Sequence, residues 1–584
     1  MEEDMRRRFT RVLGLVLAGA LAAPAIPAPS IPSASALAIG RFTTQYRGAG
    51  WQEVSDVVVN TTTGDVFVTG WSTSTPNAVG PITNVDGGSN STAYLSKISL
   101  AGQVQWTKEI GRLNYDRRPS RMAIDTDGNV YVTMTDRART SSAKLHVQVV
   151  KYSAAGVELW GRTLASLDGE ENAYGIDVRG ANVIVANSTT GSFGAAVGYQ
   201  DIVVSLLNSS TGAVLKHRQF GTFGTDIPSA GVKYMADGSV LVGGATTGIG
   251  HIGVNRLVAR QDEDFYWVKY DSTLTNRTAV KQWGSTSNDR LTSFAVQPDG
   301  TFYISGNSSG AVAGVVRHGG VDGHIYAYSS ANELRWSVGI GTAADESIVE
   351  LGTWAGASHI QFFGTTNGVV FDGSAGLADV FGGTIDPAGA LTSRKQLGTS
   401  GNDLARGFAI RGNGMPVLAG LTNGAFDGSA ANNYDGFVFS PGTELGSLVE
   451  FVGTLAKITV VPLPSFTPLA TALASESIPV AEATTGIDAG TSTGTTATTV
   501  PPLCTDQPAK TVLYRRLVAL CAGLLFKQGT TTRIRLSINN KSGVCSLSPR
   551  RRLKLNAAGT CKVKIRVIQT NGQTSAKWVV YKVA

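Results

Sequence analysis

The sequence predicts an all-β chain: a seven-bladed β-propeller with four-stranded antiparallel blades, followed by a small C-terminal β-sandwich domain. An alternating strand pattern with a Gly-containing turn recurs seven times, and the repeats close 55 to 63 residues apart. Glycine accounts for 70 of 584 residues, against a usual share of about 7%, which indicates many tight turns. The segment 503–584 differs from the rest in charge and holds all four cysteines.

The first 38 residues are expected to be a secretory signal peptide. A basic cluster at 6–11 precedes an apolar run at 12–26, and small residues at 36–38 offer a cleavage site. The run is shorter than the ~20 residues that span a bilayer, and an uncleaved anchor is the alternative. The Arg6-Arg7 pair leaves the Sec and twin-arginine routes open. We expect a secreted or cell-surface protein with no transmembrane segment in the mature chain.

Each repeat begins with two alternating segments joined by a turn. The seven first hairpins lie at Asp56–Gly70, Met122–Met134, Gly175–Asn187, Val232–Gly244, Phe294–Gly306, Trp354–Gly364 and Phe408–Gly420. A second hairpin follows, as at Tyr94–Trp106 and Ile325–Trp336, and the repeat closes on a short strand that ends in Gly. Four strands of period two in each repeat predict one antiparallel sheet.

One four-stranded sheet cannot bury both of its faces, whereas seven sheets stacked radially cover one another. We therefore expect a propeller over residues 39–453. A sandwich array would not keep one period, and β-helix repeats are far shorter. Thr43–Gly48 repeats the pattern of the unit-ending strand Arg218–Gly221. Either Thr43–Gly48 or Leu448–Gly453 can complete the last blade, and the sequence leaves this choice open.

Several phrases resemble a known repeat. They are IDTDGNVYVT at Ile124–Thr133, the Asn-Asp pairs at Asn288 and Asn402, and YDGFVF at Tyr434–Phe439. They are similar to the SBBP repeat of bacterial secreted seven-bladed β-propellers, over about residues 41–453. The resemblance implies a propeller and an extracytoplasmic setting, and it carries over no catalytic residue.

Beyond the repeats, residues 454–502 are rich in Thr, Ala, Pro and Ser and are expected to be a linker. The segment 503–584 has 16 Lys and Arg against one acid, Asp506, a net charge of +15. The remaining 34 basic and 42 acidic residues leave 1–502 at −8. The C-terminal segment therefore sets the net charge of +7.

The cysteines of this segment are expected to form two disulfides, because the domain is small and exported. Of the three possible pairings we favour Cys504–Cys521 and Cys545–Cys561, each closing a short loop worth ~3 kcal/mol in the chain-entropy model. A zinc site is the alternative, although the segment lacks His and C-x2-C. Gly543–Val583 resembles small Ig-like β domains of exported actinobacterial proteins, which implies the same Cys545–Cys561 pair.

Alternation places basic residues on one face of these strands, namely Lys554, Lys562, Lys564 and Arg566. Such a face suits anionic cell-wall polymers or phospholipid head groups. The alternative is a solvated face that protects the sheet edges from aggregation. Nucleic acid is not expected as a partner, because the domain is exported and has few aromatics for stacking.

The motifs for chemistry are weak. Gly306–Gly310 matches G-x-S-x-G but lacks the strand-to-helix turn of a nucleophile elbow. Asp125–Asn129 is similar to a calcium loop but lacks the full ligand order, and a tight hairpin turn explains it. The six His have no metal-ligand spacing. We expect no cofactor, no metal site and no catalytic residue.

An acid begins nearly every repeat. These residues are Asp116, Glu171, Asp226, Asp289, Asp345 and Asp403. They are expected to ring one end of the channel. A residue repeated in nearly every blade favours a turn-fixing role, since catalysis needs asymmetry. The alternatives are a cation in the channel, or an extracellular glycan hydrolase or lyase that uses Asp289 and Asp403.

Asymmetric loops are the better candidates for a binding site. The fourth unit is the longest, and its extra segment carries His251, Arg256, Arg260, Asp262 and Asp264. The loop Thr75–Tyr94 is unusual in unit one. We therefore expect a non-enzymatic binding or scaffold protein for an unidentified protein or glycan, with 503–584 attaching it to anionic envelope polymers.

Overall fold

We describe the chain from a computed structural model. The described residues of the propeller are 42–48, 50–73, 91–110, 115–138, 143–166, 168–193, 198–222, 224–248, 262–354, 356–371, 376–426 and 433–441. Beyond them, 483–486 and the C-terminal strands given below are described. Within these ranges no helix has the length and hydropathy needed to cross a bilayer.

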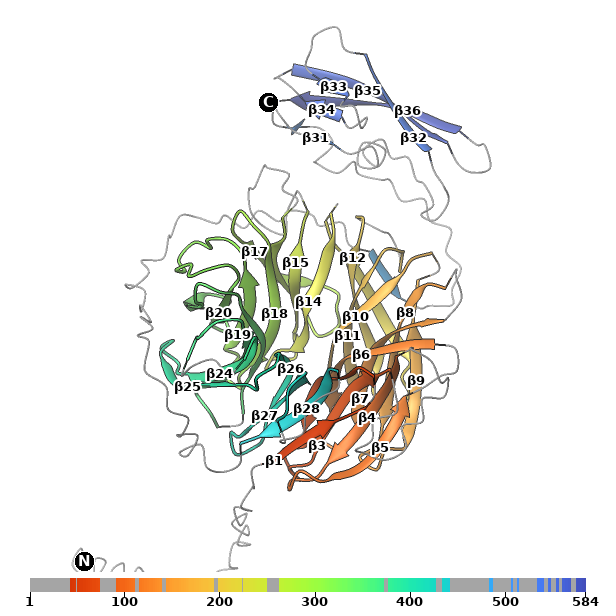
Figure 1. Ribbon diagram of the computed structural model, residues 1–584. Helices are drawn as coiled ribbons and strands as arrows, with labels where there is room; N and C mark the ends of the chain where they lie inside the picture. Colours follow the sequence, from red (N-terminus) through yellow and green to blue (C-terminus); the bar gives the residue numbers. More distant parts are fainter. Residues whose placement is uncertain are drawn as a thin grey trace, which may run out of the picture. The chain divides into compact units, whose positions relative to one another are not determined.

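Seven antiparallel sheets surround a common axis (Figure 1). Each has four propeller strands, and β29 (Ala483–Gly486) adds a fifth strand to the sheet of blade three. In the first six, strand order follows the chain, from the channel outward. Blade one comprises β2 (Gln52–Val59), β3 (Val66–Ser72), β4 (Thr92–Ile98) and β5 (Val104–Ile110). Blade two comprises β6 (Tyr115–Ile124), β7 (Val130–Ala138), β8 (Leu145–Tyr152) and β9 (Glu158–Leu164). Blade three comprises β10 (Glu171–Arg179), β11 (Asn182–Thr189), β12 (Asp201–Asn208) and β13 (Val214–Phe220).

The next three blades repeat this arrangement. Blade four comprises β14 (Asp226–Tyr234), β15 (Val240–Thr246), β16 (Asp264–Tyr270) and β17 (Arg277–Trp283). Blade five comprises β18 (Asp289–Val296), β19 (Phe302–Ser308), β20 (Asp322–Tyr328) and β21 (Leu334–Ile340). Blade six comprises β22 (Glu346–Gly352), β23 (Ile360–Thr366), β24 (Asp379–Ile385) and β25 (Leu391–Leu397). The structure thus confirms the seven-bladed propeller.

Blade seven combines the two ends of the repeat region. It comprises β26 (Asp403–Ile410), β27 (Pro416–Thr422), β28 (Asp435–Ser440) and, as its outermost strand, β1 (Phe42–Tyr46). β1 runs antiparallel to β28, with Phe42 opposite Ser440 and Tyr46 opposite Gly436 (Figure 1, red beside cyan). Of the two closing strands that the sequence allows, the structure therefore uses Thr43–Gly48. Leu448–Gly453 lies outside the described residues.

β1 also makes the Gln–Asp hydrogen bond that joins the outer strand to its neighbour in other blades. Gln45 Nε2 donates to Asp435 Oδ2 at 3.1 Å, joining β1 to β28. The same bond joins the outermost strand to its neighbour in three other blades, as Gln219–Asp201, Gln282–Asp264 and Gln396–Asp379. The N-terminal strand is therefore the missing fourth strand of the seventh repeat.

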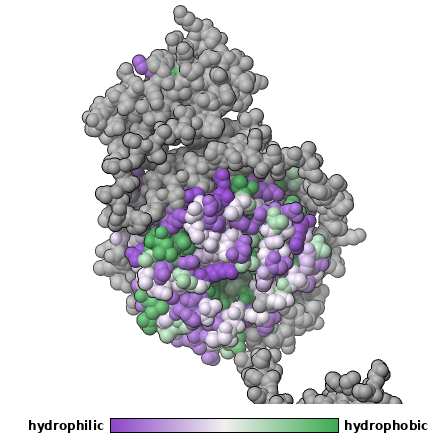
Figure 2. Space-filling view, turned by 180° about the vertical axis from the view of Figure 1, so that it is seen from behind, coloured by the Kyte–Doolittle hydropathy of each residue, from purple (hydrophilic) through white to green (hydrophobic). Residues whose placement is uncertain are grey.

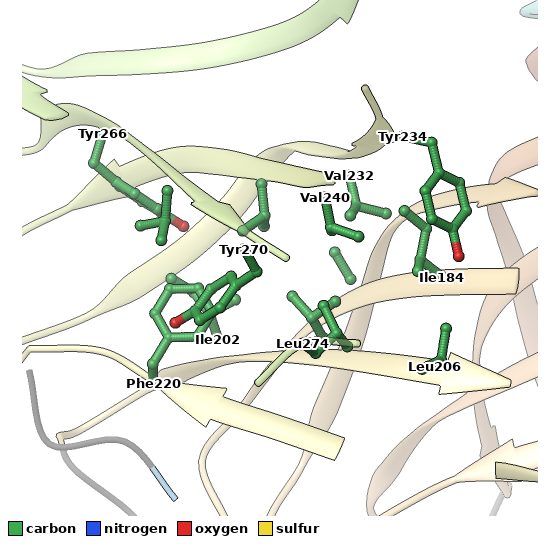
Figure 3. Close-up of a cluster of buried hydrophobic side chains, with 14 residues drawn as sticks. Ile184, Ile202, Leu206, Phe220, Val232, Tyr234, Val240, Tyr266, Tyr270 and Leu274 are labelled. Carbon is green, nitrogen blue, oxygen red and sulfur yellow. The ribbon is translucent and has the colours of Figure 1, made fainter. Parts of the chain in front are cut away.

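The core consists of seven apolar clusters, one at each interface between neighbouring blades. Figure 3 shows the cluster between blades three and four, where Ile184 and Ile202 lie close to Val240 and Tyr270. The cluster between blades seven and one includes Tyr46 of β1 and continues the ring. Alternating strands thus bury both faces of every sheet against a neighbour.

Two further sheets are described in the C-terminal segment. One contains β30 (Asp506–Gln507), β36 (Thr574–Val583), β35 (Gly559–Ile568) and β32 (Arg533–Asn539), in that order. The other contains β31 (Val512–Leu513), β34 (Leu553–Leu555) and β33 (Cys545–Leu547). Their packing as an Ig-like sandwich stays a prediction.

Several expectations fall wholly or partly outside the described residues. They include the signal peptide at 1–38 and most of the linker, within which β29 (Ala483–Gly486) pairs with β13. Cys504 and Cys521 are also outside, and only the backbone of Cys545 and Cys561 is described. Both disulfides therefore stay predictions.

We expect Gln45→Ala to lower the free energy of unfolding by about 1–3 kcal/mol, because it removes a hydrogen bond to a buried carboxylate. Denaturant unfolding of the full chain measures the change. Thr43→Ala, in the same strand but half-buried, is the matched control and should cost less than about 0.5 kcal/mol. Equal effects of the two variants would contradict the role of Gln45 in closure.

Candidate functional site

The acids that begin the repeats are enclosed inside the blades. Five blades place a fully buried acid at the first residue of the inner strand: Glu171, Asp226, Asp289, Glu346 and Asp403. By register, Gln52 and Arg117 hold the equivalent positions in blades one and two. Asp116 and Asp345 therefore lie one residue before the buried position at the start of the inner strand. Asp345 Oδ1 accepts a hydrogen bond from Val321 N at 2.9 Å.

These buried acids fix turns. Asp226 accepts hydrogen bonds from Thr222 N at 2.5 Å, from Thr222 Oγ1 and from Thr246 Oγ1. Asp403 likewise accepts from Thr399 N and Thr399 Oγ1. Burial raises the pKa of Asp226 and of Asp289 to about 6, although the hydrogen bonds oppose this rise. None of the five acids lines the channel cavity.

The channel holds a cavity of about 590 Å³, lined by all seven inner strands. Figure 2 shows one face of the propeller with a central hollow, apolar surface inside it and mostly hydrophilic side chains around it. Charged side chains from five blades line the cavity. They are Asp56, Arg121, Asp177, Arg179, Lys233 and Glu350.

Each carboxylate in the cavity is held by a backbone N–H of the next blade. Met122 N donates to Asp56 Oδ2 at 2.6 Å, and Tyr234 N donates to Asp177 Oδ2 at 2.8 Å. Phe408 N donates to Glu350 Oε2 at 2.9 Å. The three acids therefore join neighbouring blades as well as lining the cavity.

Arg121 and Lys233 act on the same two acids across the channel. Burial raises the pKa of Asp56, and it raises that of Glu350 to about 8, while the charges of Arg121 and Lys233 oppose both rises. Arg121 Nη1 donates to the carbonyl oxygen of Arg406 at 3.4 Å, and Lys233 Nζ lies 3.8 Å from Asp177 Oδ1. The cavity thus places cations from three blades beside three acids that backbone N–H groups hold.

A second asymmetric feature lies where the inner strands begin. Trp51 lies near two aromatic residues: the ring of Trp71 is 6.2 Å away and nearly parallel, and that of Tyr434 is 4.5 Å away and tilted by 34°. The Arg118 guanidinium lies over the Trp71 ring at 4.6 Å. We call these four residues the blade-one row, although Tyr434 belongs to blade seven and Arg118 to blade two.

The candidates in the long loop of unit four are only partly described. His251, Arg256 and Arg260 lie outside the described residues. Asp262 is half-buried, and Asp264 is the first residue of β16, where Gln282 Nε2 donates to its Oδ2 at 3.0 Å. Asp264 thus belongs to the Gln–Asp pairs that join outer strands.

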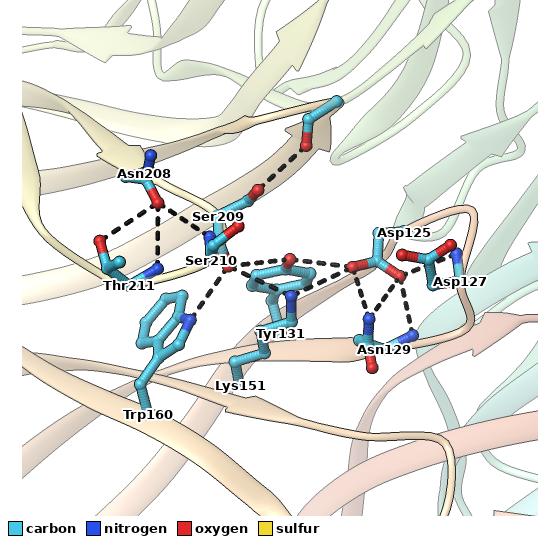
Figure 4. Close-up of polar contacts among 11 residues, drawn as sticks. Asp125, Asp127, Asn129, Tyr131, Lys151, Trp160, Asn208, Ser209, Ser210 and Thr211 are labelled. Carbon is cyan, nitrogen blue, oxygen red and sulfur yellow. Dashed lines mark hydrogen bonds and ion pairs between the residues drawn. The ribbon is translucent and has the colours of Figure 1, made fainter.

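In the calcium-like turn, groups of the protein itself occupy the hydrogen-bonding positions of the Asp125 carboxylate (Figure 4). The Asp125 carboxylate accepts hydrogen bonds from Asn129 N at 2.8 Å and Tyr131 Oη at 2.9 Å, and Lys151 Nζ lies at 3.4 Å. Among the described residues, no group of three or more His, Cys, Asp or Glu side chains could hold a metal ion. Ser308 of the G-x-S-x-G string is buried in β19 and donates a hydrogen bond to Asp289, so its hydroxyl joins two strands of blade five.

The basic C-terminal strands follow the expected alternation in part. Lys562, Lys564 and Arg566 occupy alternate positions of β35 and share one face of its sheet. Ser537, opposite Lys564, is exposed, while Val563 between the lysines is buried. Lys554 lies on β34 of the other sheet.

Comparison with known proteins supports the repeat type. The SBBP family model, described as a β-propeller repeat, matches residues 105–133, from the end of blade one into β7. No curated protein matches the chain.

Solved structures similar to this chain share about a tenth of its residues. One is the β-propeller domain of the Trilobed protease from Pyrococcus furiosus, with 10% identity and a TM-score of 0.35 over 65% of this chain and 94% of that one. A protein of unknown function from Dyadobacter fermentans has 9% identity and a TM-score of 0.36 over 68% and 99%. The ulvan lyase of polysaccharide lyase family PL25 has 10% identity and a TM-score of 0.39, over 69% of this chain and 99% of that one. Likenesses at this level carry no argument about the activity of this chain.

Neither asymmetric feature was predicted from the sequence. A signal was available, since the positions after the inner-strand bulge include Asp56, Arg121 and Glu350 in three blades. In the other four blades this position holds a small residue, Gly175, Gly231, Ser293 or Gly407. A charge there marks a position that faces the channel and is not needed for the repeat.

The raised pKa of Asp226 predicts a pH-dependent variant effect. A carboxyl whose folded pKa lies above its unfolded value contributes stability that is present below about pH 4 and is lost as pH rises through about 6. We expect the difference in unfolding free energy between the native chain and Asp226→Asn to be roughly 2 kcal/mol larger at pH 4 than at pH 7.5.

Urea unfolding at the two pH values measures this difference. Asp271→Asn is the control, because hydrogen bonds lower the pKa of Asp271 to about 2 despite some burial. Its effect should differ by less than about 0.5 kcal/mol between the two pH values. A pH-independent effect of Asp226→Asn would contradict the raised pKa.

Proposed function

We propose that this chain is an exported binding protein without catalytic activity. Its propeller recognises a ligand through the asymmetric residues at the channel and at the blade-one row. Its basic C-terminal segment attaches it to anionic polymers of the cell envelope.

The observation that carries this proposal is the anchoring of the acids. The repeated acids accept hydrogen bonds from backbone and hydroxyl groups inside the blades, as at Asp226 and Asp403. The cavity acids Asp56, Asp177 and Glu350 each accept a backbone N–H from the next blade. A glycosidase pair needs carboxyl groups whose protons are free to move to and from a substrate. Acids committed to joining strands favour recognition over catalysis.

The second part of the proposal rests on charge. The segment 503–584 has a net charge of +15, whereas 1–502 has −8. Lys562, Lys564 and Arg566 share one face of β35, and Ser537 and Lys564 on that face are accessible. A positive sheet face attracts polyanions through long-range electrostatics.

The test of the first part is a search for cleavage. We expect the full chain, incubated with polygalacturonate and with neutral polysaccharides, to release no reducing ends and no unsaturated uronate. Cleavage that is lost in Glu350→Gln, Asp289→Asn or Asp403→Asn would contradict the proposal and favour the channel-carboxylate enzyme.

For the second part, we expect the triple variant Lys562→Gln, Lys564→Gln, Arg566→Gln to bind immobilised heparin at least about tenfold more weakly at low salt, because three charges near the polyanion are lost. Salt should remove most of the native binding through screening. Elution of the full-length chains on a salt gradient measures the difference.

The control removes the same net charge from exposed propeller positions: Lys108→Gln, Arg317→Gln and Arg335→Gln. It should elute with the native chain. Co-elution of the two triple variants would contradict a specific role for the β35 face.

A further inference from the structure

The blade-one row is a partly exposed aromatic surface that is held by backbone hydrogen bonds. Trp51 is 38% exposed, although its ring is parallel to that of Trp71 and tilted against that of Tyr434. Its backbone is fixed on both sides, because Trp51 N donates to Thr73 Oγ1 at 2.9 Å and Thr73 N donates to Trp51 O at 3.0 Å. Gln52 N donates to Tyr434 O at 2.8 Å and ties blade seven to the row. A surface ordered in advance loses little entropy when a ligand binds.

The row is particular to the junction around blade one. Trp71, on β3, lies opposite Glu53 of β2. The register equivalents of Trp71 in the other six blades are Thr135, Ser188, Ala245, Asn307, Thr365 and Leu421. A structural need of the blade would place an aromatic residue there more than once. Blade geometry therefore does not explain the tryptophan.

Arg118 supplies the charge of the row. It is exposed, and no carboxylate among the described residues forms an ion pair with it. Glu53, the acid on the neighbouring strand, is paired with Arg406 at 3.3 Å and accepts a hydrogen bond from Ser55 Oγ. The guanidinium lies on the Trp71 ring, which holds it in place through cation–π attraction. Its donors remain for a ligand.

One exposed indole ring, beside a second indole that carries a guanidinium, suits one class of ligand. The apolar C–H face of a sugar ring packs against an aromatic ring and leaves its hydroxyl groups in water. A carboxylate on the same sugar accepts two parallel hydrogen bonds from an arginine. A neutral sugar or a purely aromatic ligand would use the rings and leave the charge of Arg118 uncompensated.

We infer that the blade-one row binds an acidic polysaccharide, with a uronate sugar ring against Trp51 and its carboxylate on Arg118. The inference rests on the proposed binding function and names its ligand class. The row spans blades seven, one and two, so the polymer lies across the junction where β1 closes the ring.

The experiment measures binding of a galacturonate oligomer to the full chain by calorimetry, beside the neutral galactose oligomer of the same linkage and length. We expect Trp51→Ala to raise the Kd of both oligomers at least about tenfold, which corresponds to about 1.4 kcal/mol. Arg118→Gln should raise the Kd of the acidic oligomer about fivefold or more and change that of the neutral one less than about twofold. Trp51→Phe should restore part of the affinity.

Two exposed residues outside the row serve as controls. Tyr199→Ala removes an aromatic side chain that is 65% exposed, and Arg317→Gln removes an exposed cation. Both should bind like the native chain, and all variants should keep the native melting temperature within a few degrees.

Three outcomes would overturn the inference: no saturable binding of either oligomer, equal losses in Trp51→Ala and Tyr199→Ala, or equal losses for both oligomers in Arg118→Gln. Binding with no row dependence would leave the proposed binding function standing and remove the site. Cleavage of the oligomer would contradict the proposed non-catalytic function. The Kd of Trp51→Ala would still show whether the blade-one row is the binding site.

Discussion

The coverage of both faces of every sheet is the constraint on which this structure depends. A single four-stranded sheet of alternating strands leaves an apolar face open to water, and radial stacking covers it only if the ring closes. Seven apolar clusters at seven blade interfaces meet this need. Closure comes from β1, which carries Tyr46 into the last interface and Gln45 to Asp435. The channel, its cavity and the blade-one row all follow from that closed ring.

Repetition and asymmetry have different roles in this ring. The repeated polar residues act inside blades, where Asp226 fixes a turn and Gln219 joins two strands. The residues that occur once face the channel or the surface, as Arg121, Lys233 and Trp51 do. A ring of equivalent blades can gain a site only by local departures from its own pattern. The departures, more than the repeated acids, therefore indicate where a ligand binds.

Much of the fold was predictable because it is local. Turn residues such as Gly128, at φ +80°, mark each hairpin, and period-two alternation marks each strand. The closing strand was recognisable by composition but not assignable, because two segments matched the pattern. The acids illustrate a finer limit. Asp345 and Glu346 are adjacent and chemically alike, and only the strand register decides which one enters the blade.

The complete site was not predictable because one of its residues, Tyr434, meets the others only through closure. Trp51 and Tyr434 come from the two ends of the repeat region and become neighbours once β1 completes blade seven. A ligand that spans blades seven, one and two binds the closed ring and not an open one. By linkage it stabilises closure, by about 2.7 kcal/mol at a hundredfold excess over its Kd. Recognition and closure are therefore parts of one equilibrium, and the junction of the ring is where a bound polymer would influence the stability of the whole propeller.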